Sequence, residues 1–267
     1  MDRRALIARL ERAGIRADKS LGQNFLVEPE VLQTIVDSAA LTNEDTVLEI
    51  GPGLGFLTEQ LSARAKRVVA IETDERMVSH LTKTDSMVEL RHEDILQSEL
   101  SDLTDFKVVA NIPYYITSPI FRKILSLKDK PSSITALVQK EVAERICAAP
   151  GKMSVLALSI QYYAKPQLVR MVPADSFVPA PKVDSAVLHV EVYERPAFEA
   201  DEKKLFQLIK AGFGEKRKML RNSLAGGLHL ETDQVLGLLK EAKLPDTARA
   251  QELSLSDWEK LYRAWQA

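Results

Sequence analysis

Three closely spaced glycines directly after a short apolar run set the strongest constraint on how this chain folds. Residues 46–50 (Thr-Val-Leu-Glu-Ile) have the character of a buried β-strand, and Gly51, Gly53 and Gly55 follow at once. Glycine lets the backbone turn sharply and allows a ligand to approach the main chain closely. Because a helical pattern begins at residue 54, the segment predicts a strand–turn–helix unit whose turn binds a small molecule.

Apolar runs alternate with helical patterns along residues 46–192. Further strands are expected at 67–72, 87–91, 107–111 and 134–139. The intervening segments predict crossover helices at 54–64, 74–83 and 117–127. Strands covered by helices on both faces form parallel sheets, so the pattern predicts a doubly wound, mostly parallel α/β fold of the Rossmann-like type. Segments 168–173 and 185–192 are expected to add an antiparallel edge pair.

The chain changes character after residue 195. Helical patterns punctuated by Gly226, Gly227 and Pro245 follow, and predict helices at 201–211, 217–225, 232–242 and 256–266. We therefore expect an α/β domain over 1–195 and a small all-helical domain over 196–267.

Charge is distributed unevenly between these two regions. The whole chain has a net charge of −2, whereas residues 203–221 carry seven basic side chains against Glu215 alone. Such a cluster is often a solvated helix face, but it also suits a nucleic-acid backbone. The candidate phosphate contacts are Lys216, Arg217, Lys218 and Arg221.

Composition excludes several classes of protein. No apolar run approaches the ~18 residues that span a bilayer, and the N-terminus lacks the apolar core of a signal peptide, so we expect a cytoplasmic protein. Cys147 is the single cysteine and excludes an internal disulfide. The four histidines are scattered without metal-ligand spacing, and we expect no metal.

Acidic residues follow the next two predicted strands. Glu72 lies 21 residues after Gly51, where a carboxylate can accept both hydroxyls of a ribose, and Asp94 can accept from an adenine amino group. The G-x-G-x-G spacing differs from the G-x-G-x-x-G of dinucleotide sites, and no Lys-Ser/Thr pair for a polyphosphate follows. A nucleoside-like cofactor is therefore expected, although the glycines also suit an ordinary tight turn and the acids suit solvated strand ends.

The tetrapeptide Asn111-Ile112-Pro113-Tyr114 ends the fourth predicted strand, at the same edge of the sheet. The Asn111 amide oxygen and a backbone carbonyl would accept from an exocyclic amino group, and Tyr114 would stack on its ring. Pro113 restricts Ile112 to extended backbone, which would aim the Ile112 carbonyl. An Asn–Pro turn with a packed Tyr is the ordinary alternative. Beside a cofactor turn, the tetrapeptide predicts methyl transfer to adenine N6.

The chain resembles the ribosomal RNA adenine N6,N6-dimethyltransferases, and within them the members that act on small-subunit (16S) rRNA. The resemblance covers most of the chain between residues 19 and 222. Besides the glycine turn and the tetrapeptide, the matching segments are Lys-Ser-Leu-Gly-Gln-Asn-Phe-Leu at 19–26, Gln-Lys-Glu-Val-Ala-Glu-Arg at 139–145, Phe-Val-Pro-Ala-Pro-Lys-Val-Asp-Ser at 177–185 and Lys-Arg-Lys-Met-Leu-Arg-Asn at 216–222.

The resemblance implies a class I methyltransferase domain that binds S-adenosylmethionine. By position, Gly51 would lie against the amino-acid portion of the cofactor, Glu72 against its ribose and Asp94 against its adenine. The resemblance also implies roles for the residues near the reaction centre. These are Asn24, Leu26 and Gly53 in cofactor binding, Asn111 in cofactor binding and catalysis, Ile112, Pro113 and Tyr114 at the reacting base, and Phe177 on the base opposite Tyr114.

The implied reaction is dimethylation of N6 of two adjacent adenosines near the 3′ end of 16S rRNA. The implied partner is 16S rRNA within an immature small ribosomal subunit, and the implied state is a monomer. One departure is visible: residues 150–155 (Pro-Gly-Lys-Met-Ser-Val) are shorter than the family's loop and lack its tyrosine. Any contact assigned to that loop is therefore in doubt.

Three alternatives stay open at this stage. A large-subunit (23S) rRNA methyltransferase of the antibiotic-resistance type shares the glycine turn and Asn-Ile-Pro-Tyr, but the 177–185 and 216–222 segments favour the small-subunit type. A non-catalytic RNA-binding assembly or transcription factor could use the same fold, although Glu72, Asp94, Asn111 and Tyr114 argue against lost catalysis. A nicotinamide dehydrogenase is disfavoured by its glycine spacing.

Overall fold

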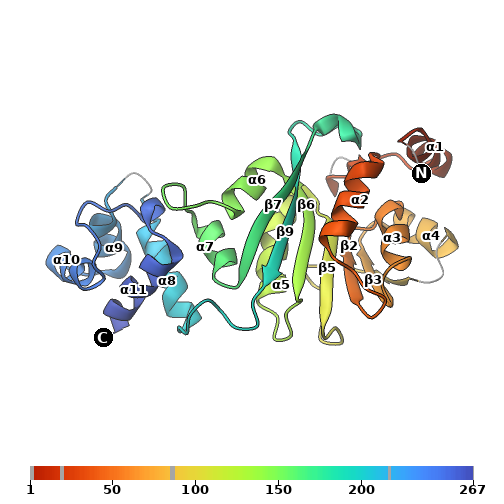
Figure 1. Cartoon of the computed structure of the whole chain (residues 1–267). Coiled ribbons are helices and arrows are strands. Elements are labelled where there is room, and N and C mark those ends of the chain that lie inside the picture. Colours follow the sequence, from red (N-terminus) through yellow and green to blue (C-terminus); the bar gives the residue numbers. More distant parts are fainter. Residues whose placement is uncertain (1–2, 19–20, 85–87, 216–217, 267) are drawn as a thin grey trace. The chain divides into compact units, whose positions relative to one another are not determined.

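The computed structural model describes residues 3–18, 21–84, 88–215 and 218–266. The chain divides into two compact units, one made of residues 1–143 and 165–192 and the other of residues 144–164 and 193–267 (Figure 1). This division differs from a single boundary at residue 195, because residues 144–164 belong to the helical unit. None of the helices within the described residues combines the length and apolar character needed to cross a bilayer.

The first unit is built on a seven-stranded sheet in the order β4–β3–β2–β5–β6–β9–β7. The pairs β4–β3, β3–β2, β2–β5 and β5–β6 are parallel, and β6–β9 is antiparallel. The strand bounds are β2 Thr46–Ile50, β3 Arg67–Glu72, β4 Glu89–His92, β5 Phe106–Asn111, β6 Ser133–Gln139, β7 Ala164–Val172 and β9 Ser185–Val192. The predicted doubly wound, mostly parallel fold is confirmed.

Most predicted strands match the structure to within two residues. The strand expected at 87–91 is found at Glu89–His92, and Met87 lies outside the described residues. The strand expected at 168–173 begins earlier, at Ala164. Its first residues include Pro166, which cannot donate to a ladder, but β7 is an edge strand and tolerates a missing N–H on its open side.

Helices cover both faces of this sheet (Figure 1). Alternate strand residues such as Val47 and Val109 share one buried cluster with the apolar sides of α1, α2 and α3. Helix α2 was not among the predicted helices. It carries Pro29 in its first turn, and its core face is formed by Val31, Leu32, Ile35 and Val36. The helix bounds are α1 Arg3–Ala13, α2 Pro29–Ser38, α3 Phe56–Ser62, α4 Glu75–Thr84 and α5 Thr117–Leu125, with short 3₁₀ turns η2 Tyr114–Ile116 and η3 Ala174–Ser176.

A small second sheet joins segments far apart in sequence. Strand β1 (Phe25–Leu26) pairs antiparallel with β8 (Phe177–Val178), with Leu26 opposite Phe177. The Val27 N–H donates to the Ser176 carbonyl over 2.9 Å and extends this contact. Two of the segments that carry the family resemblance therefore meet in the fold.

The second unit is helical. Trp258 is fully buried and stacks on Phe213 with ring centroids 5.8 Å apart, whereas Trp265 is half-buried. A Cβ on Gly212 would lie only 2.4 Å from the Trp258 ring, so this close packing requires glycine. Helix α6 (Lys140–Ile146) ends in this unit, and the others are α7 Val155–Gln161, α8 Glu202–Gly212, α9 Leu220–Leu228, α10 Thr232–Glu241 and α11 Leu255–Gln266, with the 3₁₀ turn η4 Ala250–Glu252.

Candidate functional site

The candidate site is a cavity at the carboxyl ends of β2 and β5. These two strands are neighbours, and the chain runs from β2 to β3 on one side and reaches β5 on the other, so the strand order reverses between them. Ligands of open α/β sheets bind in the crevice at such a point. The cavity has a volume of about 480 Å³, within the range of roughly 300–1,000 Å³ that suits small-molecule ligands.

The glycine turn follows β2 and has left-handed backbone at each of its three glycines. Gly51, Gly53 and Gly55 have φ values of +69°, +57° and +79°, which side chains rarely allow. At Gly55 a Cβ would also lie 2.7 Å from Leu81 Cδ2. The Gly51 N–H donates to the Ile71 carbonyl and the Gly53 N–H donates to Glu72, so these two amides are not available as ligand donors. The turn would instead let a ligand come close to the main chain, because its glycines have no side chains.

Glu72 ends β3 and is only 8% exposed. Its carboxylate accepts from the backbone N–H groups of Gly53, Thr73 and Asp74 at 3.1, 2.8 and 2.9 Å. Burial raises the pKa of Glu72, and these three donors offset part of that effect. A carboxylate has about four acceptor positions, so three N–H donors leave about one for a ligand hydroxyl. Glu72 therefore shapes the turn as well as lining the cavity.

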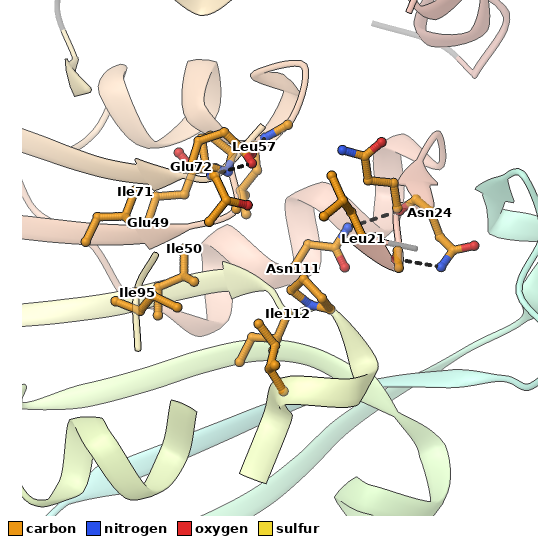
Figure 2. A pocket seen from close by; sticks show the side chains of 18 of the residues that line it. Leu21, Asn24, Glu49, Ile50, Leu57, Ile71, Glu72, Ile95, Asn111 and Ile112 are labelled. Atoms are coloured by element: carbon orange, nitrogen blue, oxygen red, sulfur yellow. Dashed lines mark hydrogen bonds between the residues drawn. The ribbon is translucent and has the colours of Figure 1, made fainter. Parts of the chain in front are cut away.

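Asp94 lies in the loop after β4 and also lines the cavity. Its Oδ1 accepts from the Leu96 N–H over 2.9 Å, so one carboxylate oxygen is committed to the loop. Figure 2 shows Glu49 and Glu72 on one side of the cavity and Asn24 with Asn111 on the other. The predicted cofactor residues Asn24, Leu26, Gly51, Gly53, Glu72, Asp94 and Asn111 all line this one cavity.

Asn111 ends β5 and is oriented by the N-terminal segment. Its Nδ2 donates to the Asn24 carbonyl over 3.3 Å, and the Asn24 Nδ2 in turn donates to the Gly22 carbonyl over 3.0 Å (Figure 2). Because the donor end of the Asn111 amide is engaged, its Oδ1 is the end that remains for an amino group. Ile112 is buried and its N–H donates to the Leu137 carbonyl, which continues the β5–β6 ladder beyond Asn111.

Tyr114 is fixed at its hydroxyl end. Its Oη lies 2.6 Å from the Oγ of Ser185, a fully buried residue at the start of β9. Burial raises the pKa of Tyr114, so the phenol stays neutral through the ordinary pH range. The ring, together with Pro113, lines the cavity. The segment at 177–185 thus supports the tetrapeptide at 111–114 through Ser185, a role not predicted from the sequence.

Phe177 occupies a different environment from the one expected. It is 2% exposed and packs in the core beside Leu26, its partner in the β1–β8 pair, and it is not among the cavity-lining side chains of the described residues. A contact between its ring and a base would require this small sheet to open.

A hydrogen-bond network that the sequence analysis missed holds the N-terminal segment on the cavity. Asp74, 6% exposed, accepts from the Gln23 Nε2 over 2.7 Å and from the Arg76 Nε over 2.9 Å. Hydrogen bonds from Arg76 lower the pKa of Asp74 to about 2. Arg76 also donates to the Arg16 carbonyl, which anchors the chain that leads into the segment. Gln23 belongs to a segment already singled out, but nothing local in the sequence points to Asp74 as its partner.

Glu49 is a second missed residue. Its carboxylate is 1% exposed, and the residue lines the cavity near Glu72 (Figure 2). A buried carboxylate carries a large desolvation cost that a cationic ligand group can offset. Its place between the apolar residues Leu48 and Ile50 of β2 is a signal that the sequence offered.

The basic cluster belongs to the second unit. Lys216 and Arg217 lie outside the described residues. Lys218 forms a salt bridge with Glu215 at 2.5 Å, and Arg221 is half-buried on α9. Both members of that salt bridge are more than half exposed, so the pair contributes little to stability.

Curated relatives match nearly the whole chain. Ribosomal RNA small subunit methyltransferase A of Dehalococcoides mccartyi (strain BAV1) is 42% identical over 260 residues, which cover 94% of this chain and 89% of the relative. The protein of the same name from Anoxybacillus flavithermus is 40% identical over 266 residues and covers 93% and 90%.

Solved structures agree with these relatives. A dimethyladenosine transferase from Plasmodium falciparum superposes with a TM-score of 0.78 at 26% identity and covers 90% of this chain and 96% of its own. The 23S rRNA methyltransferase ErmE gives a TM-score of 0.76 at 27% identity and covers 91% and 100%. The model of the family described as ribosomal RNA adenine dimethylase matches residues 14–264, and the chain therefore belongs to that family.

Proposed function

We propose that this protein transfers methyl groups from S-adenosylmethionine to N6 of two adjacent adenosines near the 3′ end of 16S rRNA. The observation that carries the proposal is the orientation of Asn111 at the cavity. Its Nδ2 is held by the Asn24 carbonyl and its Oδ1 is left as an acceptor, beside a Tyr114 ring fixed by Ser185.

The cavity suits the proposed cofactor. Its walls include the apolar side chains of Ile50, Ile71 and Ile95, which can pack on a flat purine. Glu72 retains about one acceptor position for a ribose hydroxyl. The buried carboxylate of Glu49 favours the positive charge of an ammonium or sulfonium group. S-adenosylmethionine, when bound, supplies an electrophilic methyl group.

The protein's contribution to the reaction is alignment and polar stabilisation. Adenine N6 is a weak nucleophile because its lone pair is delocalised into the ring. Acceptance of its hydrogens by Asn111 Oδ1 and by a backbone carbonyl of the tetrapeptide draws N6 toward tetrahedral geometry and frees the lone pair. The methylated N6 carries a positive charge and releases one proton to solvent, which leaves it with one hydrogen. The second transfer therefore proceeds with one of these acceptors unused. No nucleophilic side chain and no strong general base is required.

The relatives and the second unit support the RNA substrate. Relatives near 40% identity carry the small-subunit name, whereas ErmE, a 23S enzyme, is 27% identical, and this difference favours 16S rRNA. We assign the second unit to RNA binding through Lys216, Arg217, Lys218 and Arg221, with an immature small ribosomal subunit as the partner. We further propose that the protein acts as a monomer in the cytoplasm. A base must leave its stack to enter a cavity of this kind.

Methylation of unmethylated ribosomal subunits tests the proposal. The wild-type protein should methylate 16S rRNA within small subunits at two adjacent adenosines, and Asn111→Ala should lose turnover by orders of magnitude. Asn43→Ala is the matched control, because Asn43 is exposed and lies just before the opposite, amino end of β2. Methylation of 23S rRNA instead would overturn the substrate assignment, and near-normal turnover of Asn111→Ala would overturn the assigned chemistry.

A further inference from the structure

Tyr115 is a large aromatic side chain that the proposed reaction does not use. It is 62% exposed, although it lines the cavity next to the half-buried Tyr114. Single exposed apolar side chains are common and carry no meaning by themselves. The position of Tyr115 is distinctive because consecutive tyrosines place one ring inside the cavity and one at its exposed margin.

The Tyr115 ring is supported by the backbone of Gly22. A Cβ built on Gly22 would lie 3.2 Å from Cε1 and 3.3 Å from Cδ1 of Tyr115, which is tighter than ordinary contact. Gly22 has φ +66°, so glycine is favoured there twice over, by backbone conformation and by the ring. The ring therefore rests against the N-terminal segment.

The backbone that carries Tyr115 is also fixed. Tyr115 is the central residue of η2, in which the Ile116 N–H donates to the Pro113 carbonyl over 3.2 Å. The Thr117 hydroxyl donates to the Tyr114 carbonyl over 3.2 Å and begins α5. The exposed ring thus has a defined location and an uncovered surface, which are the properties of a stacking platform for a nucleic-acid base.

We infer that Tyr115 and Gly22 form a base-stacking subsite for the nucleotide next to the target adenosine. The inference rests on the proposed function, in which two adjacent adenosines are modified. With one adenine beside Tyr114 inside the cavity, the neighbouring base lies outside it, at the margin where Tyr115 is exposed. Stacking is tolerant of base identity because every base has a π-face, so the subsite takes any base and binds purines best.

Loss of one stacked base should weaken RNA binding about 5- to 150-fold, which corresponds to roughly 1–3 kcal/mol. Tyr115→Ala should therefore raise the KM for RNA, or the Kd, by a factor in that range. Tyr115→Phe and Tyr115→Trp keep an aromatic face and should retain most of the affinity. The affinity for S-adenosylmethionine should not change in any of these variants.

The experiment uses the full chain and a synthetic RNA that contains the two adjacent adenosines. One RNA carries 2-aminopurine beside the target, because stacking on an aromatic ring changes its fluorescence. A second RNA carries an abasic residue at the same position. Tyr193→Ala is the control, because Tyr193 is also exposed, at 36%, and lies outside this subsite.

The wild-type protein should quench the 2-aminopurine and lose affinity for the abasic RNA, whereas Tyr115→Ala should do neither. Non-additive effects of the protein and RNA changes would establish direct contact. Equal losses on the abasic RNA in wild-type and Tyr115→Ala proteins would overturn the subsite while leaving the proposed function intact. Failure of the wild-type protein to methylate 16S rRNA in small subunits would instead remove the proposed function and, with it, the basis for the subsite.

Discussion

The hydrogen bond between Tyr114 and Ser185 allows a quantitative prediction of how the stability changes when the Tyr114 hydroxyl is removed. Tyr114→Phe keeps the ring but removes the hydroxyl 2.6 Å from Ser185 Oγ, a group that is fully buried. A buried hydroxyl left without its partner costs about 1–3 kcal/mol, whereas replacing both partners with apolar groups is nearly neutral. Tyr114→Phe should therefore be destabilised by about 1–3 kcal/mol, and adding Ser185→Ala should recover most of that loss.

The assay is a double-mutant cycle over the wild-type protein, both single variants and the double variant. Because the chain has two compact units, its unfolding need not be two-state, and the transition of the first unit must be resolved separately. Hydrogen exchange of the β6 and β9 amides, which pair through Gln139 and Ser185, reports on that unit. Equal protection in Tyr114→Phe and in the double variant would refute the reasoning.

Catalysis by the same four proteins gives a second measurement of this pair. The ring of Tyr114→Phe can still stack on a base, but it has lost the contact that fixes its position. Turnover should therefore fall moderately, by far less than in Asn111→Ala. Unlike stability, turnover should not recover in the double variant, because Ser185→Ala does not restore the anchor.

Two further predictions concern the cofactor and the RNA. Glu72→Gln replaces an acceptor of three backbone N–H groups with an amide that has a single acceptor oxygen, so calorimetry should show affinity for S-adenosylmethionine reduced by roughly 1.5–3 kcal/mol. Burial raises the pKa of Glu72, so on acidification the cofactor affinity of the wild-type protein should begin to fall at a pH above the ordinary glutamate value of 4.5, and Glu72→Gln should lack that dependence. The same raised pKa means that the ionised carboxylate destabilises the fold at neutral pH and that this penalty disappears in acid. Changing Lys216, Arg217 and Lys218 together to Glu should weaken RNA binding and reduce the log–log salt slope by roughly 0.7–0.9 per lost phosphate contact, whereas Lys240→Glu, an exposed lysine of α10, should not. An unchanged salt slope in the triple variant would show that this cluster does not hold RNA.

Elements with strong local periodicity could be predicted from the sequence. The bounds of strands such as β2 and β3 could be predicted because both faces are buried and most of their residues are apolar. The early start of β7 could not be predicted, because Pro166 argues against a strand unless that strand lies at the edge of the sheet. The strand order places β7 at the edge, and the sequence alone does not give that order. The β1–β8 pair is only two residues per strand, too short for any period to show.

The candidate site likewise combines residues whose positions could be predicted from the sequence with hydrogen bonds that could not. Glu72, Asp94 and Asn111 could be placed together because parallel strands bring their carboxyl ends to one edge, so that strand order alone makes these residues neighbours. The bonds that orient them join segments with no such relation: Asn24 with Asn111, Gln23 with Asp74, and Tyr114 with Ser185. Each depends on how a loop crosses the sheet edge, and a shift of one residue in that loop would break it. Sequence patterns therefore locate the groups that line the cavity, whereas the hydrogen bonds that orient those groups depend on how the loops pack.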